Sequence, residues 1–565
     1  MSAPRARWDA ARWPQLALAV AMVLASALIL WSGRGLDLVV DDLYYYARLV
    51  DDAGALLRYD ALDTEWLLAP HNGHLQLTGK LIYEGVFGIL GPDYTVLRVL
   101  ELLGILTCVG LYFALARRRA GAPFALVTSV LVLFLGAAWE PMLWPFDLHT
   151  VYALAAGLGA LCALDRYGAR ADPLACLLLL FSITTIELGL AFVVGVGILI
   201  AAERPWLRRA WVVAVPLVLY AAWWIWARRF DQGEIIWSNI SDLPGSAFDS
   251  LTAVLASLTG LISQDSIPQV VDPPGIAAAL SVLAIAALAM QVARRGAPVT
   301  LLAASAILLT YWAFIALADR PPDSSRYMLA GALLVLLVAA EAFRGALRLP
   351  AVIAAVAVVA AVAVPFNIAK LADGRAAHLS ESTASRAHFS MLELAGERVD
   401  PAFAPWLDPA VQQAGPGVIV SLNAGDYLAA ADRFGSIAFS LDELRSRDEP
   451  FRRVADATLV RALELELRSA GDRRPGSGCR TVAGRAAGFG EPFELAPGNW
   501  LLRARSSVPA ELAISRFTGP SPSFSLGEVV AGRWSSLHLP PDSAPDPWLG
   551  FVDRSVRVCP GEVRR

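Results

Sequence analysis

Long apolar runs separated by short loops dominate this chain of 565 residues and constrain its fold more than any other feature. A helix needs about 20 apolar residues to cross a bilayer. The runs lie near residues 14–31, 94–116, 123–139, 146–164, 174–202, 210–227, 275–293, 298–318, 327–343 and 350–368. Hydrophobic residues make up 56% of the chain and charged residues 17%, with a mean hydropathy of +0.53. We therefore predict a mostly α-helical, polytopic membrane protein. The net charge of −4 argues against a nucleic-acid partner.

Charge sorts the loops onto two sides of the membrane. The basic clusters are Arg117-Arg118-Arg119, Arg166 with Arg170, Arg204 with Arg208 and Arg209, Arg294-Arg295, and Arg344 with Arg348. The positive-inside rule makes these loops cytoplasmic and leaves loops 33–93 and 228–274 outside. Within the first of these, Leu75 to Leu90 is amphipathic and is better suited to lying on the membrane than to crossing it.

The run 174–202 breaks the alternation, because basic loops flank it on both sides. We predict a hairpin of two short helices with Glu187 near its outer turn. About eleven transmembrane helices then place the N-terminus inside and the C-terminal region outside. Arg5, Arg7 and Arg12 precede the first run and no clean cleavage pattern follows it, so we expect a retained signal anchor.

After the transmembrane part, 1–370, the apolar content falls. We predict an extracytoplasmic mixed α/β connector over 371–470 and an extracytoplasmic β-sandwich over 471–565. In the connector, Val418-Ile419-Val420 favours a strand and Asp456 to Leu467 an amphipathic helix. Short alternating runs follow, and a disulfide between Cys479 and Cys559 would stabilise them by roughly 4 kcal/mol. The sandwich either binds glycan or braces the membrane part.

An acidic pair, Asp41-Asp42, stands just beyond the first apolar run and is followed by Tyr44 and Tyr45. A carboxylate in this outer loop can take the proton from an acceptor hydroxyl, while its neighbour tunes it or holds a cation. The alternative is an ordinary solvated charge or a helix cap.

A second cluster, His71-Asn72-Gly73-His74, lies in the same loop. A spacing of three brings both histidines to one helix face, where they suit hydrogen bonds to a phosphate or a sugar. The alternative is an amphipathic interfacial loop. Zinc lacks a third ligand of fitting spacing.

Further charges stand near the outer ends of later runs. Arg326 follows Asp323-Ser324-Ser325 and suits a phosphate or carboxylate, with Arg320 as a substitute and snorkelling as the alternative. The remaining candidates are Glu140, Asp147 and His149 around Trp139–Pro145, and Glu187. Helix capping is the alternative for Glu140 and Asp147, and an interfacial belt is the simplest interpretation of Trp223, Trp224 and Trp226.

Together, Asp41-Asp42-Leu43-Tyr44-Tyr45, His71 to Leu90 with Gly91-Pro92-Asp93-Tyr94, Trp139–Pro145 and Ser325-Arg326-Tyr327 resemble the GT-C superfamily of polyprenyl-phosphate-sugar-dependent glycosyltransferases. The resemblance covers roughly residues 14–370. The tail, with Asp432-Arg433-Phe434-Gly435, looks like that of uncharacterised bacterial membrane proteins.

The resemblance implies a multi-pass protein of the bacterial plasma membrane. It would move a sugar from a polyprenyl-phosphate donor to an envelope glycan, lipid or protein on the outer face. Asp41 would be the base and Asp42 its partner. Arg326 or His74 would hold the donor phosphate, and His71, Tyr44, Tyr45, Glu140 and Glu187 would complete the substrate site. Some members need a divalent cation, and the acidic pair suits either case.

Two other classes stay open. A transporter or flippase for lipid-linked glycans would carry charges in mid-span, and beyond Glu101 and Glu187 the runs hold few. An assembly protein would act through its outer sandwich.

Overall fold

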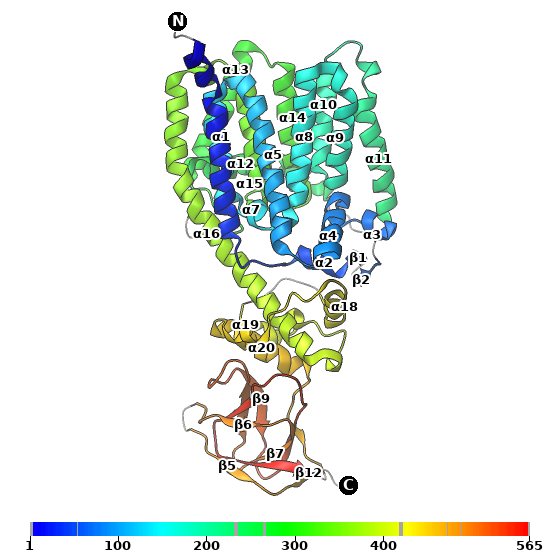
Figure 1. The fold of residues 1–565 in the computed structure, drawn as a ribbon, viewed down its shortest axis with the longest axis vertical. Helices are drawn as coiled ribbons and strands as arrows, with labels where there is room; N and C mark the ends of the chain where they lie inside the picture. Colours follow the sequence, from blue (N-terminus) through cyan, green and yellow to red (C-terminus); the bar gives the residue numbers. More distant parts are fainter. Residues whose placement is uncertain are drawn as a thin grey trace. The chain divides into compact units, whose positions relative to one another are not determined.

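The computed structural model describes residues 4–52, 55–60, 62–230, 235–263, 267–416, 422–471, 473–485 and 488–562. The chain divides into two compact units, which we describe separately. The helical unit comprises Met1–Gly35 and Arg48–Ala377, and the C-terminal unit comprises Leu36–Ala47 and His378–Arg565. Figure 1 shows the helices of the first unit and the strands of the second. The predicted fold class, mostly helical with a C-terminal β-sandwich, is confirmed.

The helical unit is a bundle whose helices pack along apolar faces. Among the described residues, eight helical stretches are long and apolar enough to cross a membrane, and two shorter apolar helices accompany them. Its helices are α1 (Pro4–Ser32), α3 (Thr64–Leu68), α4 (Leu77–Leu90), α5 (Tyr94–Ala120), α6 (Ala122–Leu133), α7 (Glu140–Leu143), α8 (Leu148–Tyr167), α9 (Asp172–Thr185), α10 (Leu188–Ala201), α11 (Trp211–Ala227), α12 (Leu243–Thr259), α13 (Gly275–Arg295), α14 (Val299–Leu317), α15 (Ser325–Ala342) and the start of α16 (Pro350–Ala395). These spans do not fix the predicted number of about eleven.

The predicted break in the run 174–202 is confirmed. Helix α9 ends at Thr185, Ile186 is extended, and α10 begins at Leu188. The Thr185 hydroxyl donates back to the Phe181 carbonyl at 2.7 Å, which favours ending the helix there. Gly189 is needed for the tight return, because a Cβ at this position would lie 2.4 Å from the backbone nitrogen of Ile183. Glu187 lies in the turn between the two helices.

The two long loops contain more structure than the sequence indicated. Loop 33–93 holds the hairpin β1 (Leu49–Asp52) and β2 (Ala55–Arg58), together with α3 and α4. The interpretation of 228–274 as a loop is wrong over Leu243–Thr259, which forms the 17-residue helix α12 and packs against α13, α14 and α15. Its buried Ser250, Thr252 and Ser257 gave it too polar a sequence to be recognised as a packed helix.

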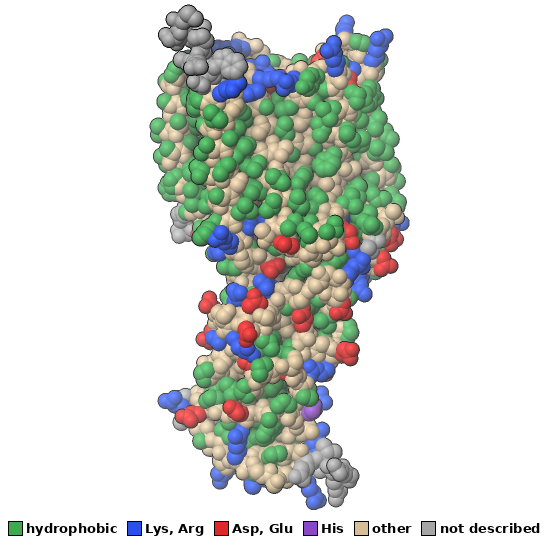
Figure 2. All heavy atoms as spheres, in the orientation of Figure 1, with side chains coloured by type: hydrophobic (Ala, Val, Ile, Leu, Met, Phe, Trp, Pro, Cys, Tyr) green, Lys and Arg blue, Asp and Glu red, His purple; other side chains and the backbone are tan. Residues whose placement is uncertain are grey.

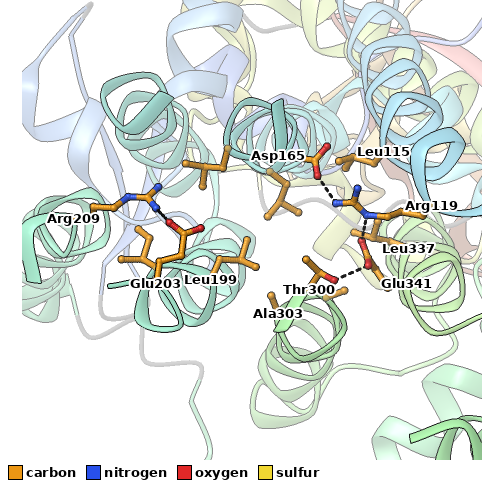
Figure 3. A pocket seen from close by; sticks show the side chains of 14 residues that line it. Leu115, Arg119, Asp165, Leu199, Glu203, Arg209, Thr300, Ala303, Leu337 and Glu341 are labelled. Atoms are coloured by element: carbon orange, nitrogen blue, oxygen red, sulfur yellow. Dashed lines mark hydrogen bonds and ion pairs between the residues drawn. The ribbon is translucent and has the colours of Figure 1, made fainter. Parts of the chain in front are cut away.

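Arginines collect at the end of the helical unit where α5 and α15 end, and Figure 2 shows Lys and Arg gathered there. Figure 3 shows how carboxylates pair with them around a cavity of about 280 Å³. Arg119 contacts Asp165, and its Nε donates to Glu341 at 2.7 Å. Arg209 binds Asp172 through two nitrogens, at 2.6 and 2.9 Å. We call this the basic end.

The C-terminal unit combines short helices with two antiparallel sheets. Its helices are α2 (Asp41–Ala47), α17 (Pro409–Gln412), α18 (Ala424–Phe434), α19 (Leu441–Arg445), α20 (Glu449–Ala462) and the end of α16. The predicted bounds Asp456 to Leu467 are wrong, because helix α20 runs from Glu449 to Ala462. Pro450 lies in its first turn. Proline fits there because its missing N–H has no helical partner at that position. The predicted strand Val418-Ile419-Val420 lies outside the described residues.

The sandwich consists of two sheets with an apolar interior. The first has the order β3 (Arg468–Ser469), β10 (Ser535–Leu539), β7 (Gly498–Ala504), β12 (Val556–Glu562), β4 (Arg474–Pro475), with β5 (Arg480–Val482) also on β12. The second has the order β6 (Phe493–Leu495), β11 (Trp548–Val552), β8 (Ala510–Ser515), β9 (Phe524–Val529). Leu502, Val558, Ile514 and Phe551 are buried. Cys479 and Cys559 form a disulfide.

A buried carboxylate joins α20 to this sandwich. Asp456 accepts hydrogen bonds from the backbone nitrogens of Phe517 and Thr518, at 2.8 and 3.1 Å. It also accepts from the hydroxyls of Thr518 and Ser523, at 2.6 and 2.8 Å. Burial raises the pKa of Asp456, and the hydrogen bonds partly offset this effect. The helices and the sandwich are thus held together by specific contacts.

Candidate functional site

A small polar cavity of about 90 Å³ brings together many of the predicted site residues of the helical unit. Its polar side chains come from loop 33–93, from Asp147 and the start of α8, from the α9–α10 turn, from α14, and from α15 with the loop before it. They are Asn72, His74, Gln76, Asp147, His149, Thr150, Glu187, Tyr311, Arg320, Arg326 and Tyr327. Five sequence-distant segments thus converge on one polar space.

The two histidines of loop 33–93 close a tight turn. The backbones of His71 and His74 exchange hydrogen bonds of 3.0 and 2.9 Å, and Asn72 and Gly73 between them have φ of 49° and 78°. The prediction that His71 and His74 share one face of a helix is therefore wrong. Asn-Gly favours a two-residue turn in which both residues have positive φ, and this signal was present in the sequence. His71 is buried against the Phe146 ring, with centroids 5.4 Å apart, while His74 lines the cavity.

His74 contacts the carboxylate that the hairpin turn presents. Its Nδ1 lies 2.7 Å from Oε2 of Glu187. Burial acts to raise the pKa of the Glu187 carboxyl. The charge of His74, hydrogen bonds from the His74 side chain and from the backbone, and the charge of Arg320 outweigh this effect, so the pKa is lowered. The carboxylate form of Glu187 is thus favoured beside a cluster of cationic groups.

Arg326 and Glu140 meet on the other side of the polar cavity. An Arg326 nitrogen lies 3.6 Å from one oxygen of Glu140, and the hydroxyl of Ser325 donates to the other. Glu140 is buried, whereas Arg326 keeps 30% of its side chain exposed and stacks 5.1 Å from the Trp144 ring. Glu140 therefore contacts two successive residues at the start of α15, Ser325 and Arg326.

Helix α4 packs closely against His149, which lines the polar cavity. His149 is buried, and its Nδ1 contacts the Phe146 carbonyl. Gly79 of α4 lies against the same ring, since a Cβ there would be 1.8 Å from Nε2 of His149. Only a residue without a side chain lets α4 approach this closely.

A larger cavity of about 560 Å³ adjoins the polar one, because both are lined by His74 and Glu187. Its walls are largely aromatic and apolar, with Tyr220, Trp223, Trp224, Trp237, Phe314 and Arg228 among the lining residues. Trp223 is held in place by a 2.8 Å bond from its Nε1 to the Leu68 carbonyl. We call this cavity of about 560 Å³ the tryptophan cavity. Trp223, Trp224 and Trp237 therefore line a cavity, an arrangement that the interfacial-belt interpretation did not predict.

The acidic pair belongs to the C-terminal unit. Asp41 and Asp42 open α2, and both are buried, with 8% and 0% exposed. An oxygen of Asp42 accepts from the Val39 nitrogen at 3.1 Å, so this residue does fix the start of the helix. Burial and the charges of Asp41 and Asp42 raise the pKa of Tyr45 well above its ordinary value. Tyr44 is partly exposed.

Three polar cavity residues, Gln76, Thr150 and Tyr311, were not selected from the sequence. Tyr311 lies within an apolar run, and Gln76 is buried at the start of α4. A hydroxyl in mid-run was the only signal for Tyr311. Among the described residues, no group of three or more His, Cys, Asp or Glu side chains is arranged to hold a metal ion. The divalent cation stays an open expectation.

Fold and site together define a polytopic membrane protein with a polar cavity in its helical unit and a C-terminal β-sandwich. No protein-family model matches the chain, and no curated protein matches it. Among solved structures it is similar to the crystal structure of ArnT from Cupriavidus metallidurans bound to undecaprenyl phosphate. The identity is 15% and the TM-score 0.41, over 69% of this chain and 81% of ArnT. At these values the likeness assigns no residue and no activity to this chain.

Proposed function

We propose that the protein is a membrane glycosyltransferase that moves a sugar from a polyprenyl-phosphate donor to an envelope acceptor. The observation that carries the proposal is the polar cavity with Arg320, Arg326 and His74, which adjoins the tryptophan cavity. A lipid-linked sugar phosphate matches these two adjoining cavities, because its anionic phosphate is joined to an apolar chain.

Donor binding follows from the chemistry of these groups. Arg326 supplies charge-assisted hydrogen bonds to a phosphate, and its 3.6 Å contact with Glu140 is long enough for a phosphate to compete. The tryptophan cavity offers apolar and aromatic surface for the first isoprene units or for a sugar ring. Glu187 keeps His74 oriented through their 2.7 Å contact. Donor binding is thus assigned to the helical unit.

The transfer step requires a base. In an inverting displacement, the acceptor oxygen bonds to the anomeric carbon as the bond from that carbon to the phosphate oxygen breaks. Asp41 takes the acceptor's proton, Asp42 tunes its basicity, and the lipid phosphate leaves with its electron pair. Both carboxyls are buried at the start of α2, which holds the pair in a fixed position.

Paired substitutions test the proposal in purified, lipid-reconstituted protein. Asp41→Asn keeps size but removes basicity, so sugar transfer from a polyprenyl-phosphate donor should fall by at least about 10²-fold. Donor affinity should change little. Asp42→Asn is the matched control, and its loss should be smaller. If only Asp42→Asn abolishes transfer, the two roles are exchanged. If neither substitution alters transfer, the protein is not a glycosyltransferase that uses this pair. That result would favour a flippase or an assembly protein.

A further inference from the structure

The segment that carries the acidic pair, Leu36–Ala47, is built into the C-terminal unit although it is distant in sequence. Two anchors hold it, one on each side of the pair. Before the pair, the Asp37 carboxylate lies 3.2 Å from an Arg386 nitrogen, and the Asp37 carbonyl lies 3.1 Å from Nε2 of His378. Both partners are on the last part of α16.

The second anchor follows the pair. The hydroxyl of Tyr46 donates to the Gly435 carbonyl at 2.6 Å. Its ring packs near the rings of Tyr427 and Phe434, with centroids 6.4 and 6.0 Å away. Tyr427 in turn stacks on Phe389 of α16 at 4.1 Å. Tyr46 is fully buried in this aromatic cluster.

Helix α2 depends on these anchors for its position. It has seven residues, and helices shorter than about 12 residues are marginal in water because nucleation is costly. The carboxylates of Asp41 and Asp42 lie in its first turn. The anchors at Asp37 and Tyr46 flank both carboxylates and act together with the buried side chains of Leu43 and Tyr45.

Arg386 is itself held firmly. Its Nε donates to the Ile437 carbonyl at 2.9 Å, and its guanidinium lies 4.0 Å from the centre of the Phe439 ring. Its charge pair with Asp37 is largely shielded, with 20% and 17% of the two side chains exposed. A fixed, partly desolvated guanidinium constrains its partner more than a mobile surface arginine does.

We propose that the C-terminal unit positions the general base for glycosyl transfer, with Arg386 and Tyr46 as its positioning residues. The inference rests on the proposed function and gives the unit a part in turnover. A positioning residue sets the geometry of the base, so its loss lowers kcat and leaves the KM for the lipid donor unchanged.

The test uses the full-length protein in lipid vesicles with a polyprenyl-phosphate sugar as donor. Arg386→Ala should lower kcat about 10-fold without changing donor KM, and Arg386→Lys should restore part of the loss. Tyr46→Phe, which removes only the 2.6 Å bond to Gly435, should have a smaller effect in the same direction. Arg445→Ala is the matched control, because Arg445 binds Asp546 elsewhere in the unit at 2.9 and 2.7 Å. It should leave kcat unchanged.

Hydrogen exchange supplies a readout that needs no activity. Arg386→Ala should speed amide exchange over residues 36–47, and Arg445→Ala should not. Unchanged exchange and unchanged kcat in Arg386→Ala would overturn the inference, as would an equal loss of kcat in Arg445→Ala. Faster exchange in Arg386→Ala combined with full transfer by Asp41→Asn would instead show that the segment is anchored as described and that the proposed base is wrong.

Discussion

The two ends of the helical unit use similar charged residues in different ways. Helix α15 reaches both, with Arg326 in its first turn and Glu341 in its last turn, roughly 22 Å apart at 1.5 Å per residue. At the basic end, Glu341 accepts from Arg119 and from Thr300, each at 2.7 Å, and only 5% of its side chain is exposed. At the opposite end, Arg326 lies 3.6 Å from Glu140 and keeps 30% of its side chain exposed.

This difference separates arginines that carboxylates hold at hydrogen-bonding distance from an arginine whose carboxylate partner lies farther away. At the basic end, Arg119 and Arg209 are bound by carboxylates at hydrogen-bonding distance, so they tie helix ends together. Figure 3 shows Arg119 between Asp165 and Glu341. At the opposite end, cationic groups border a polar cavity that adjoins an aromatic one. Both ends therefore border cavities, and they differ in how closely the carboxylate partners hold the arginines.

The largest effect should come from the basic end. Glu341→Ala removes the carboxylate that Arg119, Arg344 and Thr300 share. Loss of one partner from a buried pair costs about 3–5 kcal/mol, so thermal denaturation in detergent should shift to clearly lower temperature. Donor affinity of the molecules that remain folded should be unchanged.

Glu203→Ala is the control for this substitution. Glu203 pairs with Arg209 at the same end, but 62% of its side chain is exposed. Its loss should cost only about 0–1 kcal/mol. Equal destabilisation by the two substitutions would contradict the assignment of Glu341 to a buried structural network.

A smaller, pH-dependent effect should come from Lys80 of α4. Its Nζ donates to the carbonyls of Trp66 and Ala69 at 2.7 Å each, and burial lowers its pKa to about 7. Above that pH and below the ordinary lysine pKa, the unfolded chain binds a proton that the folded chain releases. Stability should therefore rise with pH across this window.

Comparison with Lys80→Met isolates that contribution. The difference in denaturation midpoint between the two proteins should grow in favour of the native protein as the pH increases from about 7 to about 10. A difference that stays constant over this range would show that Lys80 remains protonated in the fold.

Much of the architecture could be predicted from the sequence, because hydrophobic length and charge act locally. The apolar runs, the break at Glu187 and the alternating strands of the tail all follow from patterns within about 30 residues. Helix α12 was missed, since its buried Ser250 and Ser257 reduce its apolar character. The turn at Asn72-Gly73 differs from the predicted helix because the Asn-Gly pair favours positive φ at both positions, whereas the histidine spacing alone also fits a helix.

The candidate site was less predictable, because it depends on contacts distant in sequence. Residue type and loop position selected His74, Glu187 and Arg326, and all three line the polar cavity. Nothing local indicated that Asp37 would pair with Arg386, almost 350 residues later, or that the acidic segment would join the C-terminal unit. Long-range packing determines such contacts.

The most direct test of the account is the binding of a polyprenyl phosphate to the purified protein and to two arginine variants. Arg326→Ala removes the cation assigned to the phosphate, and Arg344→Ala removes a half-exposed arginine from the basic end of the same helical unit. We predict that Arg326→Ala weakens binding by about tenfold or more, while Arg344→Ala leaves it unchanged. Equal affinity in the native protein and Arg326→Ala, or a comparable loss in Arg344→Ala, would contradict the assignment of the phosphate to the polar cavity.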